Sequence, residues 1–231
     1  MRMVGLGALA LLPLLCLLNS DAASAASMSR FSVKQAINLP GIRIISRVWS
    51  QPSLAVPKVE LARLSDLDLA GLKKRGVKAI VFDKDNTLCE TYTNSLHPSV
   101  VDIVAQARAQ FPSAVAILSN SVGTDDDDGY AGAKLTEAGV GLPVIRHRQK
   151  KPACLEEVLA HFRGVLGSVQ PGEICVVGDR LLTDVVFANR YGLVSVLVAP
   201  LNALKDHPIA TLLRFLERSL LLPIVKLIAR K

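Results

Sequence analysis

The chain has 231 residues, which is enough for one full-sized domain with an extension at either end. Half of the residues are hydrophobic and a fifth are charged, so we expect a folded core and exclude wholesale disorder. The formal net charge of +7 favours an anionic partner, such as an acidic membrane surface or a phosphorylated substrate. Aromatic residues make up only 4%, and no basic stretch is interleaved with stacking residues, so we expect no nucleic-acid partner.

The N-terminal part of the chain, up to Val59, has features of targeting segments. In residues 1–27, Arg2 precedes an uncharged run rich in Leu, Ala and Gly, and small residues follow at Ala22–Ser27, a pattern that resembles a signal peptide. Residues 28–75 are predicted as a basic extension, since the chain from Met28 to Val59 contains basic residues and no acidic one. That composition is typical of an organellar transit peptide, and its apolar residues could also lie on a membrane surface.

The cysteines bear on the compartment. The chain has four cysteines, Cys16, Cys89, Cys154 and Cys175, and no two of them form a CxxC motif. Cys16 lies in the predicted leader, so three remain, and an odd number of scattered cysteines argues against a zinc site and against a disulfide framework. We expect buried, reduced thiols, and therefore favour targeting to an organelle over secretion.

Residues 76–205 alternate apolar runs with amphipathic segments. Short apolar runs predict buried strands at Lys78–Phe82, Ala114–Leu118, Leu142–Ile145, Ile174–Val177 and Val194–Val198. Helical spacing predicts helices over Pro98–Gln110, Tyr130–Ala138 and Leu155–Leu166. This alternation is typical of parallel βαβ units, so the predicted fold class is α/β, with a doubly wound, Rossmann-like parallel sheet. The connections are too short for a cap domain.

Two further segments have distinct patterns. The acidic run Asp125–Asp128 does not have the spacing of an EF-hand loop, so we expect a solvated loop. Residues 206–231 predict an amphipathic basic helix, which Pro223 should end or kink. This helix either packs on the domain or anchors the protein at a membrane surface, and its excess of basic residues favours membrane contact.

Polar residues follow four of the predicted strands at one edge of the sheet, where ligands bind in such folds. They are Asp83 and Asp85 after the first strand, Ser119 and Asn120 after the second, Lys150 and Lys151 shortly after the third, and Asp179 after the fourth, with Asp184 nearby. Carboxylates in this arrangement suit a hard cation such as Mg²⁺. The ordered set of four groups predicts a functional site, whereas a lone Asp-x-Asp would not.

The ordered set resembles the four motifs of the haloacid dehalogenase superfamily, over about residues 78–200. The resemblance implies that Asp83 is a nucleophile that forms an aspartyl-phosphate and that Asp85 is the general acid and base. Ser119 would bind a phosphoryl oxygen, and Lys151, preferred over Lys150 because it precedes Pro152, would neutralise charge. The Mg²⁺ ligands would be Asp83, Asp179, Asp184 and, through its carbonyl, Asp85.

Within that superfamily, the chain resembles the capless organellar phosphatidylglycerophosphate phosphatases. The stretches that carry this resemblance are Ser53–Pro57, Phe82–Leu88, Leu118–Gly123, Arg146–Pro152 and Gly178–Asp184. The resemblance implies hydrolysis of an anionic phospholipid, phosphatidylglycerophosphate, to phosphatidylglycerol, a cardiolipin precursor. It also implies the matrix side of the mitochondrial inner membrane, with a plastid or another endomembrane as the alternative. The basic, apolar ends of the chain could hold the protein against an anionic membrane, so we expect peripheral membrane contact.

The expected substrate contacts lie near these motifs: Thr87, Asn120, Arg146 and Arg148. A solvated basic turn is an equal alternative for the two arginines. Two other functions stay open from the sequence: a phosphatase of a soluble phosphomonoester or phosphoprotein, and a non-catalytic binding module on the same fold.

Overall fold

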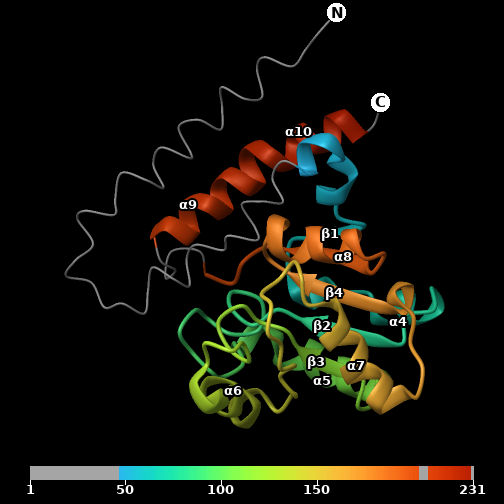
Figure 1. The fold of residues 1–231 in the computed structure, drawn as a ribbon, viewed down its shortest axis with the longest axis vertical. Coiled ribbons are helices and arrows are strands. Elements are labelled where there is room, and N and C mark those ends of the chain that lie inside the picture. The colour runs from blue at the N-terminus through green and yellow to red at the C-terminus, as the bar shows by residue number, and fades with distance from the viewer. Residues whose placement is uncertain (1–46, 203–207, 230–231) are drawn as a thin grey trace, which may run out of the picture. The chain divides into compact units, whose positions relative to one another are not determined.

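The protein is described by a computed structural model, which covers residues 47–202 and 208–229 (Figure 1). The predicted leader, residues 1–27, lies outside the described residues, as do residues 28–46 of the basic extension. Among the described helices, none is both long and apolar enough to cross a bilayer.

A five-stranded parallel sheet forms the centre of the described chain. Its strands are β1 (Val59–Leu61), β2 (Ala79–Phe82), β3 (Val115–Ile117), β4 (Ile174–Gly178) and β5 (Val194–Val198). They lie in the order β1-β5-β4-β2-β3, and every pair is parallel. The side chains of β2 are fully buried, as expected for a strand covered on both faces. The predicted α/β, Rossmann-like sheet is therefore confirmed.

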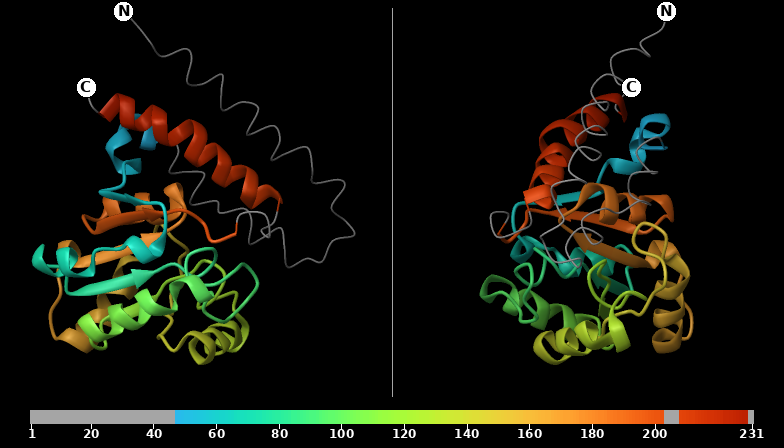
Figure 2. Two further views of the ribbon diagram at one scale, coloured as in Figure 1. Left: turned by 180° about the vertical axis from the view of Figure 1, so that it is seen from behind. Right: turned by 60° about the vertical axis from the view of Figure 1, so that its left-hand side comes forward.

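Helices cover both faces of the sheet, with α5 and α7 on opposite sides (Figures 1 and 2). The α-helices are α4 (Leu69–Lys74), α5 (Val101–Gln110), α6 (Ala131–Val140), α7 (Leu155–Leu166), α8 (Val186–Arg190), α9 (Pro208–Leu216) and α10 (Leu222–Ala229). Two further segments are π-helical turns: η6 (Leu181–Val185) and η8 (Glu217–Leu221). Right-handed crossovers between parallel strands produce this two-sided arrangement. The absence of a cap domain stays a prediction.

Two strands differ from the prediction. The edge strand β1 lies in residues 28–75, which we expected to precede the domain, and it pairs with β5 from Val59 to Leu61. The predicted strand Leu142–Ile145 is wrong, because this segment forms a single bridge, between Val144 and Ile117. Pro143 has no N–H to donate, which limits the ladder to two hydrogen bonds with Ile117.

The C-terminal helix runs through α9, η8 and α10 as one long rod (Figure 1). Pro223 is the second residue of α10 and does not end the C-terminal helix. The π-helical turn η8 ends at Leu221, directly before α10 begins. A proline removes one i→i−4 hydrogen bond, and a π turn is a common way to accommodate such a defect. On its inner side, Leu222 and Val225 pack into a second hydrophobic cluster with residues of η6 and α8.

The acidic run is only partly solvated. Asp125 and Asp128 are exposed, as expected. The carboxylate of Asp127, by contrast, accepts backbone hydrogen bonds from Gly123 (2.8 Å), Gly132 (2.8 Å) and Ala133 (2.9 Å). It therefore ties the loop after β3 to the first turn of α6.

Replacing Asp127 tests this connection. Asp127→Ala leaves three backbone N–H groups without their acceptor, so we expect the free energy of unfolding to fall by about 2 kcal/mol. Asp125→Ala, two residues away on the exposed part of the run, should change it by less than about 0.5 kcal/mol. Urea unfolding of both variants measures the difference, and equal effects would contradict a structural role for Asp127.

Candidate active site

The site lies where the chain leaves β2 and β4. From β2 the chain runs to β3 on one side, and from β4 it runs to β5 on the other side, so the connections reverse direction between β2 and β4. In such sheets, ligands bind at the carboxyl ends of the strands at this point. Asp83 follows β2 directly, and its backbone N–H donates to the carbonyl of Val177 in β4 (2.8 Å). Asp179 follows β4 in the same way, which brings the two carboxylates to one edge of the sheet.

Three carboxylates meet at this edge. Asp83, Asp179 and Asp184 each place an oxygen within 4.8 Å of the others. Asp184 comes from the π-helical turn η6, and its side chain folds back over Gly178. A Cβ on Gly178 would lie 2.3 Å from the Asp184 carboxylate, so the glycine at the end of β4 is what allows this approach.

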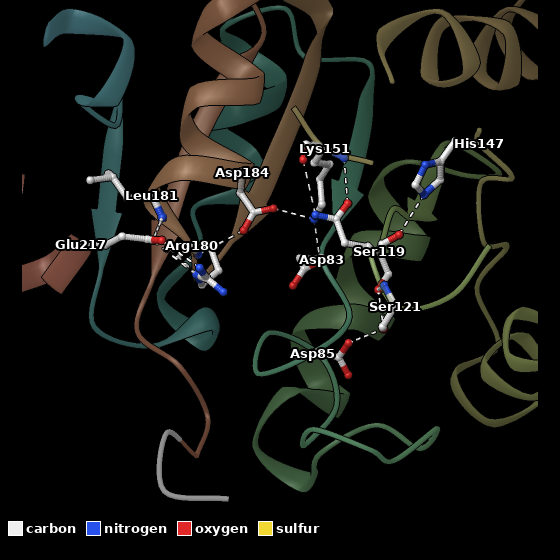
Figure 3. A network of polar contacts seen from close by, with 11 residues as sticks. Asp83, Asp85, Ser119, Ser121, His147, Lys151, Arg180, Leu181, Asp184 and Glu217 are labelled. Carbon is white, nitrogen blue, oxygen red and sulfur yellow. Dashed lines mark hydrogen bonds and ion pairs between the residues drawn. The ribbon is translucent and has the colours of Figure 1, made fainter. Parts of the chain in front are cut away.

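Lys151 joins two of these carboxylates (Figure 3). Its Nζ donates to Asp83 Oδ1 at 2.6 Å and to Asp184 Oδ1 at 2.5 Å, and its side chain is almost fully buried. Lys150 points elsewhere and pairs with Asp126 at 2.8 Å. The geometry therefore separates the two lysines in favour of Lys151.

The charged side chains of the site form buried ion pairs. Among the described residues, Lys151 pairs with Asp83 and Asp184, Arg214 pairs with Asp179, and Arg180 pairs with Glu217. Burial raises the pKa of Asp83 to about 7; Lys151 opposes this shift, and the neighbouring aspartates add to it. Burial likewise raises the pKa of Asp179 to about 6, against the influence of Arg214.

A divalent cation fits these residues. Oδ1 of Asp179 is buried and accepts no hydrogen bond within the part of the chain that the structure describes. A buried carboxylate oxygen without a donor is costly unless a cation meets it. Together with the oxygen-only donor set, this atom indicates that Asp83, Asp179 and Asp184 can hold a hard divalent ion.

Asp85 lies apart from the three-carboxylate cluster. One of its oxygens accepts from Lys84 Nζ at 2.9 Å, and the other accepts a short hydrogen bond from the hydroxyl of Ser121. Ser121 in turn shares a hydrogen bond of 2.9 Å with the Ser119 hydroxyl (Figure 3). A chain of polar groups thus connects Asp85, the predicted acid and base, to Ser119, the predicted phosphate ligand.

Two of the predicted substrate residues stay near this chain. Asn120 accepts from the backbone N–H of Lys151 at 2.7 Å, so it fixes the lysine segment. The Thr87 hydroxyl is buried and has no hydrogen-bond partner among the described residues, and its contact with substrate stays a prediction. His147 Nε2 contacts the carbonyl of Ser119 at 2.8 Å and braces that loop.

The predicted contacts of the two arginines with substrate gain no support. Arg146 makes two hydrogen bonds to the Glu137 carboxylate, at 2.9 and 3.0 Å, and stacks over Tyr130. Arg148 is exposed, and its backbone lies near Glu157. The pairing with Glu137 accounts for Arg146 as a residue that holds α6 to the segment after it.

Four residues of the site were not predicted from sequence. Lys84 and Ser121 each lie next to a predicted site residue, so their position in the motifs was an available signal. Arg214 and Glu217 lie more than 30 positions away from their partners Asp179 and Arg180. For these two, the helical pattern of the C-terminus gave no such signal. The free thiols of Cys89, Cys154 and Cys175 are buried, as predicted for the described cysteines.

The raised pKa values predict how stability depends on pH. The folded state holds protons on Asp83 and Asp179 that the unfolded chain releases near pH 4, so the metal-free protein loses stability as pH rises from about 4 to 7. We expect a loss on the order of 3 kcal/mol, smaller in Asp83→Asn, where one titrating carboxyl is gone. Urea unfolding in chelator at pH 5 and pH 8 measures this; a stability that rises with pH would contradict the burial of these acids.

The sequence is similar to known phosphatases of mitochondria and chloroplasts. The family model described as "Mitochondrial PGP phosphatase" matches residues 39–200. A phosphatidylglycerophosphate phosphatase of Arabidopsis thaliana, named chloroplastic/mitochondrial, is 40% identical over 81% of this chain and 53% of its own length. A mitochondrial phosphatidylglycerophosphatase of Saccharomyces cerevisiae is 34% identical over 68% of this chain and 84% of its own.

A bacterial relative, "Probable phosphatase YqeG" of Bacillus subtilis, is 34% identical over 65% of this chain and 80% of its own length. The chain thus spans about half the length of the Arabidopsis relative and most of the yeast and bacterial ones. No solved structure matches the chain. The match over residues 39–200 includes all three carboxylates and Lys151 but not Arg214, and by it the chain belongs to the mitochondrial phosphatidylglycerophosphate phosphatase family.

Proposed function

We propose that the protein is a Mg²⁺-dependent phosphomonoester hydrolase that uses Asp83 as its nucleophile. The observation that carries this proposal is the convergence of Asp83, Asp179 and Asp184, two of which, Asp83 and Asp184, bind the ammonium of Lys151. Phosphoryl transfer depends on in-line positioning and on charge neutralisation, and this set of side chains supplies both. The four polar groups that resemble the superfamily's motifs lie after strands of one sheet, which supports the same chemistry.

The reaction has two steps at Asp83. A carboxylate oxygen of Asp83 forms a bond to phosphorus while the bond from phosphorus to the leaving oxygen breaks, and Asp85 gives its proton to that oxygen. Asp85 then takes a proton from water, whose oxygen attacks phosphorus and releases phosphate from Asp83. Lys151 stabilises the charge on Asp83 and on the phosphoryl group, and Ser119 donates to a phosphoryl oxygen.

Mg²⁺, held by Asp83, Asp179, Asp184 and the carbonyl of Asp85, would neutralise the charge of the phosphoryl oxygens. The chain around the site organises the rest. Lys84 and Ser121 hold the carboxylate of Asp85 from two sides, which keeps it oriented for proton transfer. Asn120 and His147 fix the loops that carry Lys151 and Ser119.

The proposed substrate is phosphatidylglycerophosphate, and the product is phosphatidylglycerol for cardiolipin synthesis. The names of the Arabidopsis and yeast relatives support this substrate. Their mitochondrial or chloroplastic names likewise support a mitochondrial location, which we place at the matrix side of the inner membrane, with a plastid as the alternative. The net charge of +7 suits an anionic lipid.

We further propose that the outer face of the C-terminal helix contacts the bilayer that holds this substrate. Six of the exposed large hydrophobic residues in the described chain lie on it: Leu212, Phe215, Leu220, Ile224, Leu227 and Ile228. The described basic residues of the helix do not support the predicted attraction to lipid head groups, because Arg214, Arg218 and Lys226 contact the domain. The contact with the membrane is therefore mainly apolar.

Phosphate release tests the proposed reaction. The protein with Mg²⁺ should hydrolyse phosphatidylglycerophosphate in mixed micelles much faster than glycerol 3-phosphate or p-nitrophenyl phosphate. Lys151→Met should lower the rate by at least about 100-fold, since the charge on the phosphoryl group loses its partner, and the matched Lys150→Met should not. Equal rates on lipid and soluble substrates would refute the lipid assignment, and equal effects of the two lysine variants would refute the role of Lys151.

Sedimentation with vesicles that contain anionic lipid tests the membrane contact. The protein should pellet with the vesicles, and the double variant Phe215→Glu, Leu227→Glu should bind at least about tenfold more weakly, because it puts charge into the apolar face. Leu135→Glu, an equally exposed leucine on α6, is the control and should bind normally. The contact is refuted if the wild-type protein stays in the supernatant. It is also refuted if the wild-type protein is a dimer in solution and the double variant is a monomer, because the apolar face would then bind a second copy of the chain.

A further inference from the structure

The C-terminal helix has its charged side turned inward. Arg214, Glu217 and Arg218 lie three and four positions apart, and therefore on one face of the helix. All three contact the segment that follows β4: Arg214 bonds Asp179, Glu217 bonds Arg180 and Leu181, and Arg218 bonds the Asp179 carbonyl. A helix from the far end of the sequence thus holds the loop that carries two of the predicted metal ligands.

The contact between Arg214 and Asp179 is the one nearest the proposed chemistry. Arg214 Nε donates to Asp179 Oδ2 at 2.6 Å, and both side chains are almost fully buried. The other oxygen of the same carboxylate, Oδ1, is buried and accepts no hydrogen bond from any described residue. One oxygen of Asp179 is therefore fixed by the helix, and the other is left for a cation.

We propose that Arg214 is a positioning residue for metal binding, which orients the carboxylate of Asp179 toward Asp83 and Asp184. This inference rests on the proposed function, in which these three aspartates hold the ion. A ligating carboxylate needs an outer hydrogen bond to fix its orientation, and removal of such a partner commonly weakens metal affinity by about 10- to 100-fold. Arg214 has the planar fork and the permanent charge that suit this task.

The surrounding contacts make Arg214 a rigid support. Glu217, one turn further along the helix, accepts from Arg180 at 2.9 Å and from the backbone N–H of Leu181 at 2.8 Å. Figure 3 shows this pair beside Asp184 and the lysine bridge. The two π-helical turns, η6 and η8, contact each other here. The helix therefore cannot shift without moving the ligand-bearing loop.

A competing explanation makes the opposite prediction. An arginine that occupies the metal position in place of the ion would inhibit metal binding, and its removal would tighten that binding. The unpaired Oδ1 favours positioning, because a guanidinium that replaced the ion would leave no oxygen of Asp179 for it. The sign of the change in metal affinity separates the two explanations.

The experiment measures Mn²⁺ binding to the full chain by electron paramagnetic resonance, without substrate. Arg214→Met should weaken Mn²⁺ binding by about 10- to 100-fold, and Arg214→Lys, which keeps a cation, should recover part of the loss. Lys226→Met, on the same helix but paired with Glu60, is the matched control and should bind normally. In phosphate release, the Mg²⁺ concentration for half activity should rise in Arg214→Met more than kcat falls.

The possible failures are distinguishable. If the wild-type protein binds no Mn²⁺, the proposed metal site is refuted and this inference with it. If the wild type binds and Arg214→Met binds equally well or more tightly, only the role of Arg214 is refuted. Thermal unfolding shows whether Arg214→Met folds. If it does not, Arg214→Lys decides the question. Positioning is refuted if folded Arg214→Lys has an unchanged affinity for Mn²⁺ and needs an unchanged Mg²⁺ concentration for half activity.

Discussion

The site depends on one interaction: the ammonium of Lys151 between the carboxylates of Asp83 and Asp184. Bringing carboxylates together in a buried place is unfavourable, because each loses water and repels the others. A lysine at hydrogen-bond distance from two of them offsets part of that cost. Asp179, whose Oδ1 accepts no hydrogen bond from any described residue, leaves an oxygen for the divalent ion of the proposed reaction.

The fold supplies the rest of the arrangement. Parallel strands end at one edge, so Asp83 after β2 and Asp179 after β4 become neighbours, although almost 100 residues separate them. Gly178 leaves room for Asp184 to fold back over β4. The C-terminal helix then closes the far side of the acidic cluster with Arg214, and it presents apolar side chains outward. Under the proposed function, one helix connects the membrane surface with the metal site.

Much of this was accessible from the sequence because it is local. Buried strands such as β2 are continuous apolar runs, and the residues that follow them directly, Asp83 and Asp179, were predicted at the correct edge. Contacts that depend on the path of the chain were not accessible. The pairing of Arg214 with Asp179, and that of Arg146 with Glu137, are set by how helices dock, which no periodicity encodes. The single bridge at Val144 is a different case, since Pro143 lies within the predicted strand and was a local signal against it.

The central claim is that phosphate passes through a covalent bond to Asp83, and trapping that bond tests it most directly. Protein mixed with substrate and Mg²⁺ is quenched in acid within one turnover and treated with borohydride, which reduces an acyl phosphate on aspartate to homoserine. Mass spectrometry of the peptide that contains Val81–Thr87 should then find homoserine at position 83. Two results would contradict a covalent bond to Asp83. In the first, the protein releases phosphate but Asp83 is never found as homoserine. In the second, homoserine is found at position 85 instead.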